Sequence, residues 1–378
     1  MSKPLLVLFL TILVNLIGFG IIIPLLPFYA TAYGASPVMI GLLFASFSVS
    51  QLIASPILGE WSDRWGRRPI LILSLMGTTV SFVMLALATS LWMLFAARII
   101  DGLFGGSITT ARAYIADVTT EEDRAKAYGF LGAAFGLGFI MGPALGGFFS
   151  RFGYTAPIWV AALISLAATS LAWVWLPETL HRARAAGGSP WQALRNIAGR
   201  SPLRVLLGVD FIYWMSFAVY QTTFALFGAH RFGFDAAKTG YFLSAFGFLG
   251  VIVQGGLVGP IVRRLGEQRT LTTGLVLTAI GWGGSALTYS VPIFVLLLIP
   301  GAMGIGLCNA TLSALISHSA GSDEQGRIQG AAGALESIER DTGPVWGNAA
   351  LEYYGEGAAY AAAALLLPVA SLALGEGP

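Results

Sequence analysis

Residues 4–59 read PLLVLFLTILVNLIGFGIIIPLLPFYATAYGASPVMIGLLFASFSVSQLIASPILG and contain no Asp, Glu, Lys or Arg. A helix that crosses a lipid bilayer needs about 20 mostly apolar residues, so this stretch is long enough for two crossings. A second run over residues 270–322 also lacks these four residue types and is interrupted only by His318. The two runs predict a protein that crosses the lipid bilayer several times.

The composition of the 378 residues agrees with this prediction, because 56% are hydrophobic and only 11% are charged. Soluble domains carry about 25% charged residues. The composition therefore excludes a disordered chain, a disulfide-stapled secreted fold and a DNA-binding domain, and it disfavours a soluble enzyme. The net charge of +2 is too small to indicate nucleic acid as a partner. The single cysteine, Cys308, excludes an internal disulfide.

Hydropathy and the positions of Gly and Pro predict an all-α polytopic membrane protein with about twelve transmembrane helices. The first six lie near residues 4–29, 37–58, 69–89, 91–112, 126–149 and 155–176. The second six lie near residues 202–228, 237–261, 270–289, 292–316, 326–350 and 357–374. No small-residue cleavage site follows the first apolar stretch, which predicts a retained helix rather than a removable signal peptide.

Basic residues gather in alternate loops of this predicted arrangement. The loops after the second, sixth and eighth helices hold them, whereas the loops after the first, third and ninth helices carry no charge. Loops rich in Lys and Arg remain in the cytoplasm. The pattern therefore predicts a multi-pass protein of the plasma (inner) membrane with both termini in the cytoplasm.

The two halves of the chain resemble each other at an offset of about 200 residues. The matching positions are Gly59, Arg64 and Gly66 with Gly259, Arg264 and Gly266, and Gly142-Pro143 with Gly343-Pro344. They predict a six-helix half over 1–177, a cytoplasmic linker over 178–200 and a second six-helix half over 201–378. Parallel repeats of this kind hold a substrate site between the halves, which rock to give alternating access. Chance matching of glycine-rich helices is the alternative.

Four segments resemble signatures of one transporter family. Residues 59–68 read Gly59-Glu-Trp-Ser-Asp63-Arg64-Trp-Gly66-Arg67-Arg68, similar to the G-x-x-x-D-R-x-G-R-R signature of the major facilitator superfamily. Residues 138–147 read Gly138-Phe-Ile-Met-Gly142-Pro143-Ala-Leu-Gly146-Gly147 and resemble the antiporter signature of its drug exporters. Arg98-Ile-Ile-Asp101-Gly102 is similar to the intramembrane arginine motif of the superfamily. Asn15-x-x-Gly18-x-Gly20-x-x-x-Pro24-x-x-Pro27 looks like the first-helix motif of tetracycline and multidrug efflux proteins.

The resemblance implies the major facilitator fold and a secondary active transporter. Such a protein exports amphipathic small molecules, including tetracycline-like drugs, in exchange for protons, and it acts as a monomer without a cofactor or a metal. A metabolite exporter and a proton-coupled symporter of the same superfamily are the first alternatives. An integral-membrane enzyme and a channel are more distant, since the chain has no HExxH, Walker or G-x-S-x-G motif and its three His residues are scattered.

The loop residues Gly59, Asp63, Arg64, Gly66, Arg67 and Arg68 are candidates for a gating motif. Asp63 beside three Arg residues can bridge the cytoplasmic ends of neighbouring helices and act as a latch with two states. The alternative is a topology determinant, because any cluster of Arg holds a loop in the cytoplasm.

The glycine signature forms one nearly flat helix face. Gly138, Gly142, Gly146 and Gly147 recur at helical spacing, which lets neighbouring helices approach closely. Pro143 removes one backbone hydrogen bond and permits a bend. The face is therefore expected to pack tightly, and a further role in antiport stays open.

Charged residues inside the bilayer are candidates for proton coupling, because burying them is costly. They are Arg98, Asp101, Asp210, Glu336, Glu339 and Arg340. A carboxyl group in an apolar cavity binds a proton more readily than one in water. For Arg98 with Asp101 the alternative is a structural ion pair at spacing i, i+3. For Glu336 and Glu339 the alternative is a solvated start of their helix.

The first-helix motif departs from the drug-exporter pattern at Asn15, where an acid is usual. Asn cannot carry a proton, so another carboxylate must do so if transport is proton-driven. Arg98 favours a permanently charged Asp101, and Arg340 can pair with Glu336. Asp210 and Glu339 therefore rank first as proton carriers.

The predicted seventh helix carries an aromatic face that suits a flat amphipathic ligand. The candidates for the substrate cavity are Asn15, Phe217, Tyr220, Gln221 and Phe224, and Phe227 continues the face. The alternative is a lipid-facing or internally packed aromatic stripe.

Overall fold

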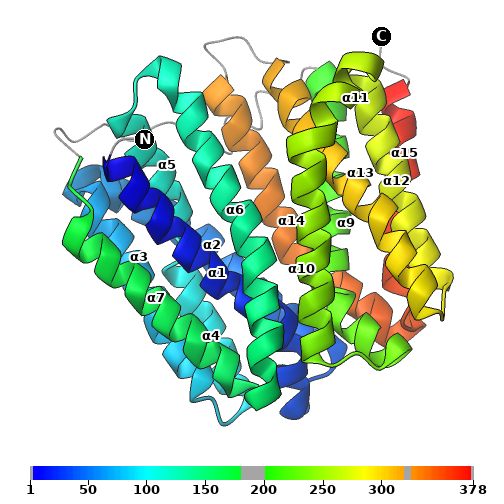
Figure 1. Ribbon diagram of the computed structural model, residues 1–378, viewed down its shortest axis with the longest axis horizontal. Coiled ribbons are helices and arrows are strands. Elements are labelled where there is room, and N and C mark those ends of the chain that lie inside the picture. The colour runs from blue at the N-terminus through cyan, green and yellow to red at the C-terminus, as the bar shows by residue number, and fades with distance from the viewer. Residues whose placement is uncertain (1–2, 180–200, 319–324, 376–378) are drawn as a thin grey trace. The chain divides into compact units, whose positions relative to one another are not determined.

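The computed structural model describes residues 3–179, 201–318 and 325–375, and every regular element in these ranges is a helix (Figure 1). Within these ranges, nine helical segments are long and apolar enough to cross a membrane. Ala358–Ala373 forms a shorter apolar helix. The prediction of an all-α polytopic membrane protein is confirmed.

The chain divides into two compact units, Met1–Ala186 with Phe234–Ser244, and Gly187–Gly233 with Ala245–Pro378. The first turns of the helix after Gly233 thus group with the first unit, which the simple division into six-helix halves does not predict. The predicted linker lies, from residue 180 onward, outside the described residues, so the boundary at 178–200 stays a prediction.

The first unit contains the helices of the first half. They are α1 (Lys3–Ala32), α2 (Pro37–Trp65), α3 (Arg67–Ala86), α4 (Leu91–Leu103), α5 (Ser107–Val118), α6 (Glu121–Phe149), the 3-10 turn η1 (Ser150–Phe152) and α7 (Thr155–Trp175). Apolar side chains of α1, α3 and α5, among them Leu8, Ile12, Leu75 and Tyr114, form its buried core. Figure 1 shows α1 and α6 side by side.

The second half of the chain contains eight further helical elements in its described ranges. They are α9 (Ser201–Phe232), α10 (Ala236–Ile252), the π-helical turn η2 (Val253–Leu257), α11 (Val258–Leu265), α12 (Glu267–Leu287), α13 (Val291–His318), α14 (Gln325–Tyr354) and α15 (Ala358–Gly375). α12 packs against α13 and α15, and α9 packs against α14 and α15.

Two predicted helices are interrupted. The fourth was predicted over 91–112, but it breaks between Leu103 and Ser107 and continues to Val118. The break leaves the carbonyl of Gly105 free, and the side-chain amide of Gln51 on α2 donates to it at 2.8 Å. The eighth, predicted over 237–261, extends to Leu265 and contains the π turn η2 at Gly255-Gly256. Glycine resists a distortion of the helix less than other residues do.

At the helix ends opposite the basic loops, a similar side-chain hydrogen bond occurs in both units. In the first unit the hydroxyls of Tyr29 and Tyr33, at the end of α1, donate to the carbonyl of Ala88 just beyond α3. In the second unit Arg231, at the end of α9, donates to the carbonyl of Thr288 just beyond α12 at 3.2 Å. In each unit the accepting carbonyl thus belongs to a residue just beyond the end of a helix.

Candidate functional site

A single glycine joins α2 to α3 and sets the geometry of the loop signature. Gly66 has φ +113°, a backbone conformation that residues other than glycine rarely adopt. A Cβ at this position would also collide with the carboxylate of Glu178. Because the turn is only one residue long, Asp63 at the end of α2 and Arg67 at the start of α3 come within reach of each other.

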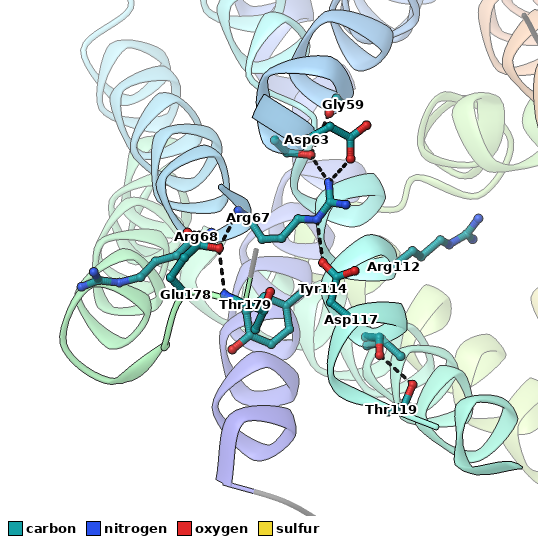
Figure 2. A network of polar contacts seen from close by, with 12 residues as sticks. Gly59, Asp63, Arg67, Arg68, Arg112, Tyr114, Asp117, Thr119, Glu178 and Thr179 are labelled. Carbon is teal, nitrogen blue, oxygen red and sulfur yellow. Dashed lines mark hydrogen bonds and ion pairs between the residues drawn. The ribbon is translucent and has the colours of Figure 1, made fainter. Parts of the chain in front are cut away.

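Arg67 is the centre of a polar network at this turn (Figure 2). Its Nη1 lies 2.6 Å from Asp63 Oδ1 and donates to Ser62 Oγ at 2.7 Å. Its Nε donates to Asp117 Oδ2 on α5 at 2.9 Å. The Arg67 side chain is only 4% exposed. One guanidinium therefore ties together the ends of α2, α3 and α5 with charge-assisted hydrogen bonds.

Glu178 joins this network from the end of the chain segment that follows α7. Its Oε1 accepts from the backbone N–H of Arg67 at 3.0 Å, and its Oε2 accepts from that of Arg68 at 3.1 Å. The first N–H groups of a helix have no partner within the helix, and the helix dipole favours a negative charge there. Glu178 therefore caps α3 and holds it against the end of α7 (Figure 2).

The side chains of the other signature residues make separate contacts. Arg64 pairs with Glu60 at 2.6 Å, but their side chains are 66% and 46% exposed. Exposed pairs of this kind contribute about 0–1 kcal/mol. Gly59 has open space where a side chain would lie. Arg68 donates to the carbonyl of Trp173 on α7.

Asp117 and Glu178 are the residues that sequence reasoning missed. Neither belongs to a quoted signature, and both reach Arg67 from segments distant in sequence. The only sequence signal for them is an acidic residue close to the end of an apolar stretch. Such a residue indicates a polar contact but does not show which residue is the partner.

We expect the replacement Glu178→Gln to lower the thermal stability of the purified protein. The amide keeps one acceptor but removes the charge that faces the start of α3, a change that costs about 1 kcal/mol. Glu60→Gln is the matched control, since Glu60 pairs only with an exposed Arg. Equal unfolding temperatures for the two variants would show that Glu178 does not hold α3.

A second charged pair lies inside the first unit. Arg98 Nη1 is 2.7 Å from Asp101 Oδ2, and the two side chains are 3% and 4% exposed. The ring of Phe47 lies under the guanidinium, with its centroid 4.2 Å from Cζ. The structure thus contains the ion pair that the i, i+3 spacing predicts. Asn15 is also buried, on α1.

The glycine signature of α6 packs directly against α1. A Cβ on Gly142 would lie 2.6 Å from the Cα of Gly20, and one on Gly146 would lie 2.7 Å from the carbonyl oxygen of Ile21. Gly138 meets Leu16 in the same way, and Gly147 meets Ala237 at the start of α10. Pro143 is buried between these glycines. The flat face is therefore a helix contact surface.

In the second unit, Asp210 on α9 and Glu339 on α14 are buried, with 3% and 0% of the residue exposed. Arg340 is exposed, and the side chain of Glu336 lies outside the described residues. Among the described residues, no group of three or more His, Cys, Asp or Glu is placed to hold a metal ion.

The aromatic candidates of α9 divide between two surroundings. Phe217 and Gln221 are half-buried, and Phe217 contacts Trp214. Tyr220 and Phe224 are buried in an aromatic cluster with Trp282, Phe294 and Tyr360. The alternative of an internally packed aromatic stripe thus describes Tyr220 and Phe224, and also Phe227.

Comparison with known proteins gives consistent matches over most of the chain. The profile of the Major Facilitator Superfamily matches residues 8–338. The tetracycline resistance protein, class C, of Escherichia coli is 31% identical over 353 residues, covering 91% of this chain and 88% of that protein. Multidrug resistance protein 2 of Bacillus subtilis (strain 168) is 32% identical over 350 residues, covering 89% and 86%. The crystal structure of the human organic anion transporter MFSD10 (TETRAN) has a TM-score of 0.74, at 24% identity and coverage of 98% and 99%.

Proposed function

Because the chain belongs to the Major Facilitator Superfamily, we propose that it exports amphipathic organic compounds, including tetracycline-like drugs, in exchange for protons. The observation that carries this proposal is the similarity to tetracycline and multidrug resistance proteins over about nine-tenths of the chain. The multi-pass arrangement of apolar helices provides the membrane location that such export needs. We propose an inner-membrane location with both termini in the cytoplasm, because Lys and Arg gather in alternate loops along the sequence.

The network around Arg67 supports a latch on the cytoplasmic side of the first unit. It joins four chain segments through one buried guanidinium and one carboxylate cap. Such contacts between helix ends hold a unit together as a rigid body. During a conformational change they either all remain or all break together. A residue that only determined topology would not need to be buried with two carboxylate partners, Asp63 and Asp117.

Proton coupling in this proposal uses a buried carboxylate, since Asn15 cannot titrate. Asp101 is buried with Arg98 at 2.7 Å, so its carboxylate is already held in an ion pair. Asp210 and Glu339 are buried within the second unit. A desolvated carboxyl group exchanges a proton close to neutral pH when its surroundings change. We therefore assign the coupling to Asp210 and Glu339.

The function itself is tested by the accumulation of tetracycline in bacterial cells. Cells that express the protein should retain less tetracycline than cells with an empty vector, and a protonophore should remove the difference. The protein's abundance in the membrane is measured alongside. Equal accumulation in both strains, with the protein present in the membrane, would contradict export of this drug.

We expect neutralisation of the proton carrier to separate substrate binding from proton-driven transport. Asp210→Asn and Glu339→Gln should each bind tetracycline with an affinity close to wild type. At least one of them should lose both the proton release that substrate binding induces and the drug transport that a pH gradient drives. Arg340→Gln is the control, because Arg340 is exposed. Full pH-driven transport by both variants would place the carrier elsewhere.

A further inference from the structure

The aromatic cluster of the second unit contains three polar groups that lack a partner. Among the described residues, none forms a hydrogen bond with the hydroxyls of Tyr220 and Tyr360 or with the indole N–H of Trp282. The three residues are only 2%, 1% and 1% exposed. They come from three different helices, α9, α15 and α12.

The ring of Tyr220 lies against both of the other two rings. The rings of Tyr220 and Trp282 are stacked, with centroids 4.9 Å apart and an interplanar angle of 12°. The rings of Tyr220 and Tyr360 are 5.3 Å apart. The donors therefore belong to one place in the fold.

Burial of these donors is costly unless something accepts from them. Tyr and Trp usually find a hydrogen-bond partner when they are buried. A buried donor without one loses the hydrogen bond that it makes to water in the unfolded chain. Phenylalanine would fill the same ring positions without this cost. In native proteins such a group calls for a bound water, an ion or another ligand.

Two neighbours of one of the donors bring no acceptor side chain. Gly301 on α13 faces the indole ring, and a Cβ at this position would lie 3.8 Å from Trp282 Nε1. The next ring neighbour on that side, Phe246, brings no acceptor. A molecule that binds here must therefore supply its own lone pairs.

We propose that Tyr220, Trp282 and Tyr360 form a donor site for a neutral oxygen acceptor. Ketone, phenol and hydroxyl oxygens of an exported compound have this chemistry, and so does a resident water molecule. If the oxygen belongs to the exported compound, the inference deepens the proposed function and rests on it. The site would then favour oxygen-rich planar compounds over purely apolar cations.

The test replaces each hydroxyl while keeping its ring. Tyr220→Phe and Tyr360→Phe are purified, and two quantities are measured: the unfolding temperature without substrate and the KM for tetracycline in proteoliposomes. Tyr213→Phe is the matched control on α9, because Tyr213 is buried and its hydroxyl donates to the carbonyl of Ile305 at 3.3 Å. It should lower the unfolding temperature by about 1–3 °C.

A substrate oxygen at the site predicts that both variants raise the KM about three- to tenfold, with kcat unchanged and a substrate-free unfolding temperature equal to or above that of the wild type. A resident water predicts a fall in the substrate-free unfolding temperature similar to that of Tyr213→Phe, with KM unchanged. If both variants equal or exceed the wild-type unfolding temperature and keep its KM, no acceptor is bound and the inference is overturned. The unfolding measurement stays informative even if tetracycline is not transported, so failure of the proposed function is recognisable separately.

Discussion

The replacement Arg67→Ala should abolish transport, the largest functional loss that we expect from any single side chain in the first unit. Arg67 holds Asp63 and Asp117 at 2.6 Å and 2.9 Å, and its own side chain is almost fully buried. Removing one partner of a fully buried ion pair costs about 3–5 kcal/mol, because the remaining charge is left uncompensated. Asp63 and Asp117 would both lose Arg67 as a partner, and their partial exposure lowers the cost below this range. Transport per inserted molecule is measured in membrane vesicles.

Two further variants separate gating from stability. Arg64→Ala removes an equal charge from an exposed pair and should transport normally. The triple variant Arg67→Ala, Asp63→Asn, Asp117→Asn removes the uncompensated charges and should recover much of the lost thermal stability without recovering transport. Wild-type transport by the triple variant would show that the charge network is not part of the mechanism.

The replacement Gly142→Ala should disrupt the first unit although it adds only one methyl group. That methyl would lie 2.6 Å from the Cα of Gly20 and 2.8 Å from the carbonyl oxygen of Ile17. Both are backbone atoms of α1, so no side-chain rotation relieves the clash. Overpacking of a tight interior costs about 1–3 kcal/mol, and we expect the upper end of this range, measured as a lower unfolding temperature and lost transport.

Gly132→Ala is the matched control for this prediction. Gly132 also lies on α6, but nothing lies within 4 Å of the position where its Cβ would be. The same methyl group on the same helix should leave folding and transport unchanged. If the two variants behave alike, close approach of α6 to α1 does not explain the glycine signature.

Local features of this fold were predictable from the sequence. The runs without charged residues indicated the membrane helices, because the free-energy cost of burying a residue in the bilayer depends on that residue's own side chain. The ion pair of Arg98 with Asp101 followed from the spacing along one helix. The end of α2 was placed too early, near residue 58, because charged residues close to the membrane surface still continue the helix to Trp65.

Contacts between distant segments were not predictable in the same way. Glu178 caps α3 only because the end of α7 lies beside the Gly66 turn, which no local pattern reveals. The aromatic face of α9 looked suited to a ligand, yet Phe224 is packed inside the second unit. Helical spacing identifies a shared face but not the surface that this face meets.

The most direct test of the central claim is tetracycline transport in proteoliposomes with an imposed pH gradient and no other ion gradient. Internal pH and drug uptake are recorded together, with and without a protonophore. Proton-coupled export predicts that the drug crosses the membrane in the direction opposite to the proton flow and that the internal pH changes as the drug moves. The protonophore should abolish both the drug movement and the pH change. Drug uptake that is the same with and without the pH gradient would contradict the assignment as a proton-driven exporter.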